Sequence, residues 1–531
     1  MKKLLYSAAL ALLILPSCTD MLMEDNKVKV SSDYVFNTPD GLSRASIALY
    51  NLERTILQTS NAGLFAALMF DAPSDIMVCR TGGGVEFSRS NFEAPNELIL
   101  AFWTNRYNII GKANEIIAGA ERLGLEDPVV KQAWGEAKLF RARMYFDLYR
   151  RFDRLYLNLE PTTVDNLERV FTPAPTEKVF ETINKDLDDA MGALDWQPAG
   201  NAAQGYEYGR MTRTIAKHVK AQVAMWQENW DEAIKQCEDI FQYSGYSMEE
   251  SAIANFRGEN LNTKENLYVF QFSESVAGGG TVAGAGVITG HHMSIHTTPR
   301  YDMAGLLFSA EYGGYGWGRH YPNYHLFTLY DQAKDKRYNE LFRHQYINNN
   351  PSSPNYGKVA TCEPSKFVER LHPMSMKYFD QWTNADVPSR QYSFKDIVIY
   401  RLAETYLIAA EAYMRKYGGS HAKAIEYYNK TWERAGNDHE NGPITLDMII
   451  DEDARECCFE GTRWYLLKRV GQLKERVRAH YGETSAENPL MSGTFDHSRR
   501  NFEDKHLCWP IPLSQVDMMG RENFPQTEGW E

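Results

Sequence analysis

The protein has 531 residues, a formal net charge of −13 and 13% aromatic residues. A chain of this length can bury a large core. Its acidic balance, which no basic stripe offsets, argues against a nucleic-acid partner, because nucleic acids are bound through clustered Lys and Arg.

The first element along the chain is a charged and then apolar leader. Lys2 and Lys3 precede an apolar run over residues 4–15. This run is shorter than the roughly 20 residues that a membrane-spanning helix requires. A short apolar run behind a positive N-terminus is typical of a secretory signal.

The end of this leader points to a lipid anchor. The sequence LPSC at residues 15–18 resembles a lipobox, in which Cys18 is acylated and becomes the mature N-terminus. The alternative is an ordinary signal peptide with an incidental cysteine. More than one acyl chain holds a protein durably at a membrane. We therefore predict a lipoprotein signal peptide over residues 1–17, a lipidated tether over residues 18–38 and a single domain over residues 39–531.

The remaining cysteines indicate neither disulfides nor zinc. They form no C-x-x-C motif, and the vicinal pair falls in a helical pattern. We expect free thiols that are buried or half-buried. These residues are Cys79, Cys237, Cys362, Cys457, Cys458 and Cys508.

Apolar residues at helical spacing predict four long helices in the first part of the chain. A plausible cap at Thr38 and Pro39 precedes the first of them. The predicted helices cover residues 42–57, 102–123, 129–152 and 177–194. Trp103 begins the second helix, and we expect it in the core rather than in a binding site.

Two later segments, residues 217–243 and 407–434, share a spacing of small residues. Each has an alanine followed twelve residues later by a second alanine and an isoleucine. This interval occurs in tetratricopeptide helix pairs, where two antiparallel helices touch closely. The alanines are Ala221, Ala233, Ala412 and Ala424. We predict a mainly α fold, a tetratricopeptide-like scaffold with helix hairpins.

Between these hairpins the text is rich in glycine and aromatic residues. The runs at 278–290, 313–324 and 348–358 are incompatible with long helices. We therefore predict a loop-rich region from about residue 247 to residue 397, carried by the helices before and after it.

The run at 312–324 is the strongest candidate for a binding surface. Glycine lets the backbone hold rings where a regular element would not, and an aromatic ring can stack on the C–H face of a sugar. Arg319 and His320 are suited to bond hydroxyl groups. The alternative is a packed loop whose rings fill the scaffold. The aromatic residues are Tyr312, Tyr315, Trp317, Tyr321 and Tyr324.

A second candidate lies earlier, in the non-helical stretch at 69–89. Its polar and aromatic side chains surround three consecutive glycines. They are Asp71, Asp75, Arg80, Phe87 and Arg89.

Two other clusters have a catalytic or metal interpretation. Glu456 and Glu460 share a helix face and so could imitate a glycosidase acid/base pair, but their arginine neighbours favour an ion-pair network. The same holds for Arg401, Glu404 and Glu411. His291, His292 and His296 have spacing that would suit zinc on a helix, but the preceding glycines favour a loop that lines a pocket.

Four stretches together resemble the SusD/RagB-like proteins, surface lipoproteins that capture nutrients for a SusC-like, TonB-dependent outer-membrane transporter. They are GEAKLFRARMYFDLYRRF at 135–152, IVIYRLAETYLIAAEAYMRK at 397–416, EDARECCFEGTRWYLLKRVGQL at 452–473 and WPIPLSQVDMMGRENFPQTEGW at 509–530. They follow the order of the family over almost the whole mature chain. Leu466, Thr527 and Glu528 depart from the usual residues, in scaffold segments.

This resemblance implies a binding protein rather than an enzyme, with no cofactor. From the residues themselves we expect no metal-ligand set and no nucleic-acid partner. The expected cargo is an oligosaccharide, the expected partner a SusC-like transporter, and the expected location the outer membrane at the cell surface, anchored through Cys18. Alternatives are a peptide or glycopeptide cargo, a surface glycoside hydrolase, and a scaffold that binds only proteins. The residues expected at the ligand are Tyr312, Tyr315, Trp317, Arg319, Tyr321, Asp75, Arg80 and Phe87.

Overall fold

The structure is a computed structural model of the chain. It describes residues 32–57, 72–82, 85–166, 168–196, 209–258, 261–275, 290–383, 385–483 and 497–531. Cys18 and its signal sequence, Asp71 and most of the glycine run at 278–290 lie outside these ranges. Within the described ranges, no helix is both long enough and apolar enough to span a membrane.

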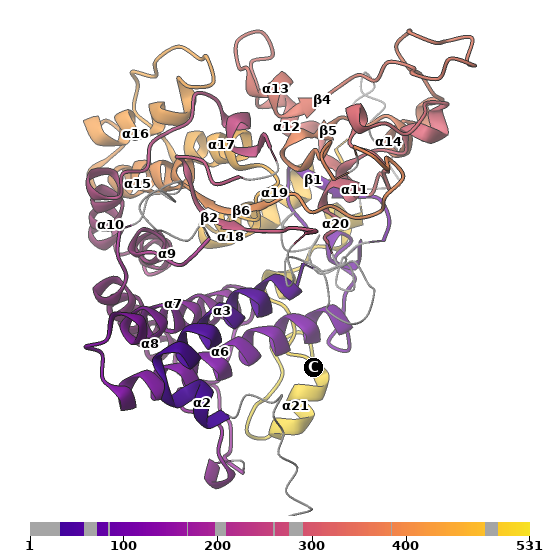
Figure 1. Ribbon diagram of the computed structural model, residues 1–531. Helices are drawn as coiled ribbons and strands as arrows, with labels where there is room; N and C mark the ends of the chain where they lie inside the picture. Colours follow the sequence, from indigo (N-terminus) through magenta and orange to yellow (C-terminus); the bar gives the residue numbers. More distant parts are fainter. Residues whose placement is uncertain are drawn as a thin grey trace, which may run out of the picture.

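A layer of long helices forms the N-terminal part of the protein, in the lower half of Figure 1. Thr38 caps the first long helix, because its side-chain oxygen accepts a hydrogen bond from Gly41 N at 3.1 Å. All four predicted helices are confirmed, and each lies against the next along α6, α7 and α8. The layer consists of α2 (Ser32–Asn37), α3 (Pro39–Thr55), α6 (Glu97–Leu123), α7 (Pro128–Arg151) and α8 (Thr176–Ala193).

The two segments with the repeated alanine spacing are helix hairpins, as predicted. Although they are far apart in sequence, α10 packs against α15, so the hairpins form one unit. Ala221 and Ala412 are fully buried in a shared apolar cluster. The helices are α9 (Arg213–Trp226), α10 (Trp230–Tyr243), α15 (Leu402–Tyr417) and α16 (Ala422–Trp432).

A short antiparallel ladder ties the hairpins to the N-terminal helices. Strand β2 (Asn266–Phe270) pairs with β6 (Ile397–Arg401), which runs directly into α15. Tyr268 of β2 donates its hydroxyl hydrogen to Glu53 of α3 at 2.9 Å. Arg143 of α7 also pairs with Glu53, at 2.8 Å. The fold is therefore mainly helical, with strands used as local joints.

The described elements between residues 247 and 397 are short, and the longest is α14 with seven residues. Two further antiparallel pairs, β1 with β3 and β4 with β5, brace this region. Its elements are η5 (Ala252–Phe256), α11 (Met293–Thr297), η6 (Tyr301–Ala304), η7 (Ala310–Tyr312), β3 (His320–Pro322), α12 (Tyr324–Thr328), α13 (Arg337–Glu340), β4 (Phe342–Arg343), α14 (Pro364–Arg370), β5 (Met374–Ser375) and η8 (Met376–Tyr378).

The remaining elements comprise three short ones in the first third of the chain and a group of helices at its C-terminal end. They are β1 (Met77–Cys79), α5 (Val85–Ser88), η3 (Val164–Asn166), α17 (Leu446–Cys457), α18 (Arg463–Arg469), α19 (Leu473–His480), α20 (His497–Asn501), η10 (Asp504–Leu507) and α21 (Leu513–Met519). The six cysteines outside the signal sequence are free and buried or half-buried, as expected. Trp103 is a core residue with 1% of its surface exposed.

The charged residues around Glu456 form a buried ion-pair network, which confirms the structural interpretation. Arg401 bonds Glu456 at 2.6 Å and Glu460 at 2.6 Å. Arg337 and Arg434 also pair with Glu456. Because these guanidinium groups come from other elements, the network fastens α17 to the loop region and to β6.

Candidate ligand-binding surface

Strands β1 and β3 bring together the two loop stretches that the sequence indicated separately. Cys79 pairs with His320 and Val78 with Tyr321 in an antiparallel register. At the end of the ladder, the backbone N–H of Arg80 donates to the carbonyl oxygen of Arg319 at 2.7 Å. The early loop and the glycine-aromatic loop are thus one surface, although more than two hundred residues separate them.

Arg80, Trp317 and Arg319 form the centre of this surface. The Arg319 guanidinium lies 4.0 Å from the centroid of the Trp317 ring, a cation–π contact. Arg80 donates from Nε to the carbonyl oxygen of Gly318 at 3.0 Å and from Nη2 to that of Trp317 at 3.3 Å. All three side chains are half-buried. We call these three residues, with the half-buried Tyr315, the Trp317 ledge.

Two histidine rings pack against Trp317 and fix its position in the ledge. The ring centroids of His292 and His296 lie 4.6 and 5.1 Å from that of Trp317, both in edge-to-face contacts. Burial lowers the pKa of His292 to about 4, so this ring is neutral at pH 7. Gly316 is required for the close approach of the loop, because a Cβ there would lie 2.3 Å from the carbonyl oxygen of Pro299. The histidines therefore support the tryptophan.

The guanidinium groups of Arg80 and Arg319 give the ledge positively charged hydrogen-bond donors. Partial burial lowers the pKa of Arg319, and the neighbouring Arg80 adds to this effect. Glu369 lies 3.5 Å from Arg80 Nη2, which partly balances the two positive charges. Sequence reasoning missed Glu369, because it lies in a short helix, α14, with no motif around it. The arrangement offers a planar ring beside donors that suit hydroxyl oxygens.

Four of the residues expected at the ligand lie in the interior instead. Tyr312 is 2% exposed and donates its hydroxyl hydrogen to the carbonyl oxygen of Ile347 at 2.7 Å. Tyr321 and Phe87 are fully buried. Phe87 packs against Trp509 with ring centroids 4.7 Å apart. For these residues the packing alternative holds, because rings with at most 2% of their surface exposed cannot stack on a ligand.

Asp75 is the fourth of these corrections. Its carboxylate is fully buried and receives two hydrogen bonds from Arg463, at 2.9 and 2.6 Å. Although burial alone would raise its pKa, Arg463 lowers the pKa of Asp75 to about 2. Asp75 is thus a structural anion. Ligand contact stays a prediction for Tyr315, Trp317, Arg319 and Arg80.

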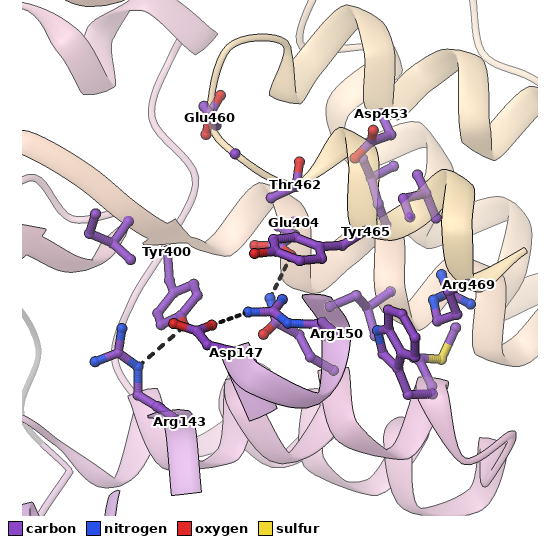
Figure 2. Close-up of a pocket in the computed structure, with 18 of the residues that line it drawn as sticks. Arg143, Asp147, Arg150, Tyr400, Glu404, Asp453, Glu460, Thr462, Tyr465 and Arg469 are labelled. Atoms are coloured by element: carbon purple, nitrogen blue, oxygen red, sulfur yellow. Dashed lines mark hydrogen bonds and ion pairs between the residues drawn. The ribbon is translucent and has the colours of Figure 1, made fainter. Parts of the chain in front are cut away.

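A partly open pocket of about 160 Å³ lies between α7, β6 and α18. Figure 2 shows Asp147 and Arg150 of α7 on one side of it and Tyr465 on the other. Its charges are largely paired, as in the 3.0 Å contact between Arg106 and Asp147. Burial raises the pKa of Asp453 in its wall to about 7. The volume of this pocket lies below the roughly 300 to 1,000 Å³ of ligand pockets, which argues against an oligosaccharide there.

A wider groove of about 580 Å³ lies in the loop region. Sequence reasoning missed it, although its aromatic pair, Phe379 and Trp382, lies within four residues of chain. Arg343 reaches over the Phe379 ring at 5.5 Å. The groove is a second concave surface with exposed polar residues on its rim. Its lining comprises Ile253, Phe256, Arg257, Asn339, Glu340, Phe342, Arg343, Met376, Phe379, Gln381 and Trp382.

Comparisons with known proteins agree on one family. The sequence model of the SusD family matches residues 288–530. SusD-like protein P25 of Formosa agariphila is 22% identical over 546 residues, 94% of each chain. The starch-binding protein SusD of Bacteroides thetaiotaomicron is 30% identical over 174 residues, 33% of this chain and 28% of that protein. The structure of a laminarin-binding SusD-like protein shares the fold, with a TM-score of 0.71 and 20% identity over 92% of this chain and 99% of that one.

Proposed function

We propose, from the premise that this chain belongs to the SusD/RagB-like family, that it binds an oligosaccharide and delivers it to a SusC-like, TonB-dependent transporter. The observation that carries the binding part is the Trp317 ledge. It combines a half-buried aromatic ring, a second ring at Tyr315 and two guanidinium groups on one surface. The starch-binding and laminarin-binding relatives support a glycan as the ligand class.

The physical basis of binding is stacking with hydrogen bonds at the edge of the ring. The C–H face of a sugar packs on an aromatic ring, and its hydroxyl oxygens accept hydrogen bonds from arginine. A few such contacts give modest affinity, because association must first offset lost translational and rotational freedom. Modest affinity suits a protein that must release its cargo to a transporter.

Removing the rings of the ledge should weaken glycan binding without unfolding the protein. In Trp317→Ala and Tyr315→Ala we expect a roughly five- to tenfold loss of affinity per ring, since each lost stacking contact is worth about 1 kcal/mol. The measurement is calorimetric titration with starch-derived and laminarin-derived oligosaccharides, together with thermal melts. Tyr417→Ala, which removes a 53% exposed tyrosine on the hairpins, serves as the matched control.

The packing alternative predicts a different pattern in the same two variants. A ring that only fills the loop would lower the melting temperature strongly when removed, and any binding loss would follow from unfolding. Full affinity in both variants would refute the ledge and direct attention to the groove at Phe379 and Trp382.

We infer that Cys18 anchors the protein to the outer membrane at the cell surface, on the basis of the LPSC sequence at 15–18. Cys18→Ala should leave the signal peptide uncleaved or release the protein from the membrane fraction, because no acyl chain can be attached. Fractionation and the mass of the mature N-terminus measure this. Correct processing with unchanged membrane retention would contradict the anchor.

Two further experiments test which class of ligand the protein binds and whether it cleaves glycans. Peptides and glycopeptides in the same calorimeter test the alternative cargo, and incubation of the glycan panel with the protein tests for hydrolysis. Binding of glycans with no cleavage products supports the proposal. Release of shorter sugars would favour a hydrolase, and binding to a transporter alone, with no glycan or peptide bound, would favour a protein scaffold.

A further inference from the structure

Two histidines and a glutamate from distant segments meet at the junction of the loop region and the C-terminal helices. His325 lies in α12, directly after β3, and His480 ends α19. Their imidazole rings are stacked, with centroids 3.6 Å apart and an interplanar angle of 11°. His480 Nδ1 lies 3.2 Å from the carboxylate of Glu483. One ligand atom from each of the three residues lies within 4.8 Å of the other two.

His325 is the only one of these three residues that is buried. Only 9% of its surface is exposed, and its Nε2 is buried without a hydrogen-bond partner. The nearest anion, the Asp75 carboxylate, is 4.0 Å away, beyond hydrogen-bond distance. Buried polar nitrogens are nearly always partnered, so an orphaned one calls for an explanation. A missing ligand at Nε2 is such an explanation.

We propose that His325, His480 and Glu483 bind one divalent transition-metal ion of the zinc class. Two imidazole nitrogens and a carboxylate oxygen are a common donor set for Zn²⁺, and a fourth position remains for water. Ligand atoms in tetrahedral zinc are about 3.4 Å apart when each bond is about 2.1 Å. To reach this spacing, the half-buried side chains of His480 and Glu483 must turn toward the ion, because the stacked rings of His325 and His480 do not direct their lone pairs at a common point.

The donor atoms of the three side chains favour this class of metal. Imidazole nitrogen suits Zn²⁺, Cu²⁺ and Ni²⁺, whereas Ca²⁺ and Mg²⁺ prefer all-oxygen sites. Arg463 and Arg476 face the same site, at 2.6 and 3.5 Å from Asp75 Oδ2. Asp75 offsets part of their charge, and Glu483 supplies the negative charge at the ion.

A metal at this position would act as a clip between two parts of the fold. His325 follows β3, and Trp317 and Arg319 lie in the loop that leads directly into this strand. His480 belongs to the helical end of the chain, and its carbonyl oxygen accepts a hydrogen bond from Asn323, the residue that caps α12. An ion bound to both histidines would tie the ledge to the helices. This role is independent of whether the ledge binds a glycan.

The test uses the full chain, purified in detergent without a histidine tag and stripped with a chelator. Calorimetry with ZnCl₂ should show one equivalent bound, and Zn²⁺ should raise the melting temperature, because an ion that binds only the folded state stabilises it. Ca²⁺ and Mg²⁺ should do neither. Co²⁺ should give the intense visible absorption of a tetrahedral site.

Substitutions of the proposed ligands test whether the ion binds at this site. His480→Gln and Glu483→Gln should each weaken Zn²⁺ binding at least tenfold, because each removes one ligand. Both variants should still fold, since the two residues are only half-buried and an amide can keep the local hydrogen bonds. His439→Gln is the matched control, because His439 is an exposed histidine 2.6 Å from Glu433. It should bind Zn²⁺ as the parent does. No binding by the parent chain, several equivalents with weak octahedral Co²⁺ absorption, or full affinity in both ligand variants would each overturn the proposal.

Discussion

Replacing Glu456 with alanine is expected to lower the free energy of unfolding by about 3–5 kcal/mol, because it leaves buried cations without their anion. Glu456 is fully buried, with Arg337 at 2.9 Å and Arg401 at 2.6 Å, and Arg434 also contacts it. Burial alone would raise the pKa of Glu456, but these guanidinium groups lower it well below its usual range. The carboxylate is therefore charged at pH 7 and central to the network.

Chemical denaturation of the purified protein measures this effect. Glu426→Ala is the control, because Glu426 is 46% exposed and pairs with Lys423 on the surface; we expect a change within about 0.5 kcal/mol. If Glu456→Ala unfolds at the same denaturant concentration as the parent, the network does not hold α17 to β6.

Replacing Ala412 with tryptophan should have the second large effect. Ala412 is 0% exposed in the cluster shared by the two hairpins, where α10 packs against α15. Even small overpacking costs about 1–3 kcal/mol, and an indole is much larger than the few methylenes that this range describes. We expect a protein that is severely destabilised or does not fold, as judged by its thermal melt and circular dichroism.

The control for this variant lies on the same hairpin. Ala422 is exposed at the start of α16, so Ala422→Trp should melt close to the parent. A normal melting temperature for Ala412→Trp would mean that the hairpins do not touch at this alanine, in conflict with the packing of α10 on α15.

Local sequence patterns predicted the helices well, because helix caps and the spacing of apolar residues depend only on neighbours in the sequence. Thr38 and Pro39 mark the start of α3, and the alanine spacing around Ala221 and Ala412 marks the hairpins. The helix α6 begins earlier than predicted, at Glu97, because Asn96 caps it through bonds to Leu98 N and Ile99 N. Caps and periodicity can be found without knowledge of distant contacts.

The site was less predictable because its causes are non-local. The pairing of β1 with β3 joins Arg80 to Arg319, and no short-range pattern indicates which loop a three-residue strand will meet. Within the glycine-aromatic run, tertiary packing decides that Tyr312 and Tyr321 are buried and that Trp317 is half-exposed. His325 and His480 likewise meet only in the folded chain.

The most direct test of the central claim, that the ledge is the glycan site, is a crystal structure of the protein with the oligosaccharide that binds it most tightly in calorimetry. We predict a sugar ring stacked on the side chain of Trp317 or Tyr315, with hydroxyl groups within hydrogen-bond distance of Arg319 or Arg80. Sugar density elsewhere, such as in the groove beside Phe379 and Trp382, with an empty ledge, would contradict the account.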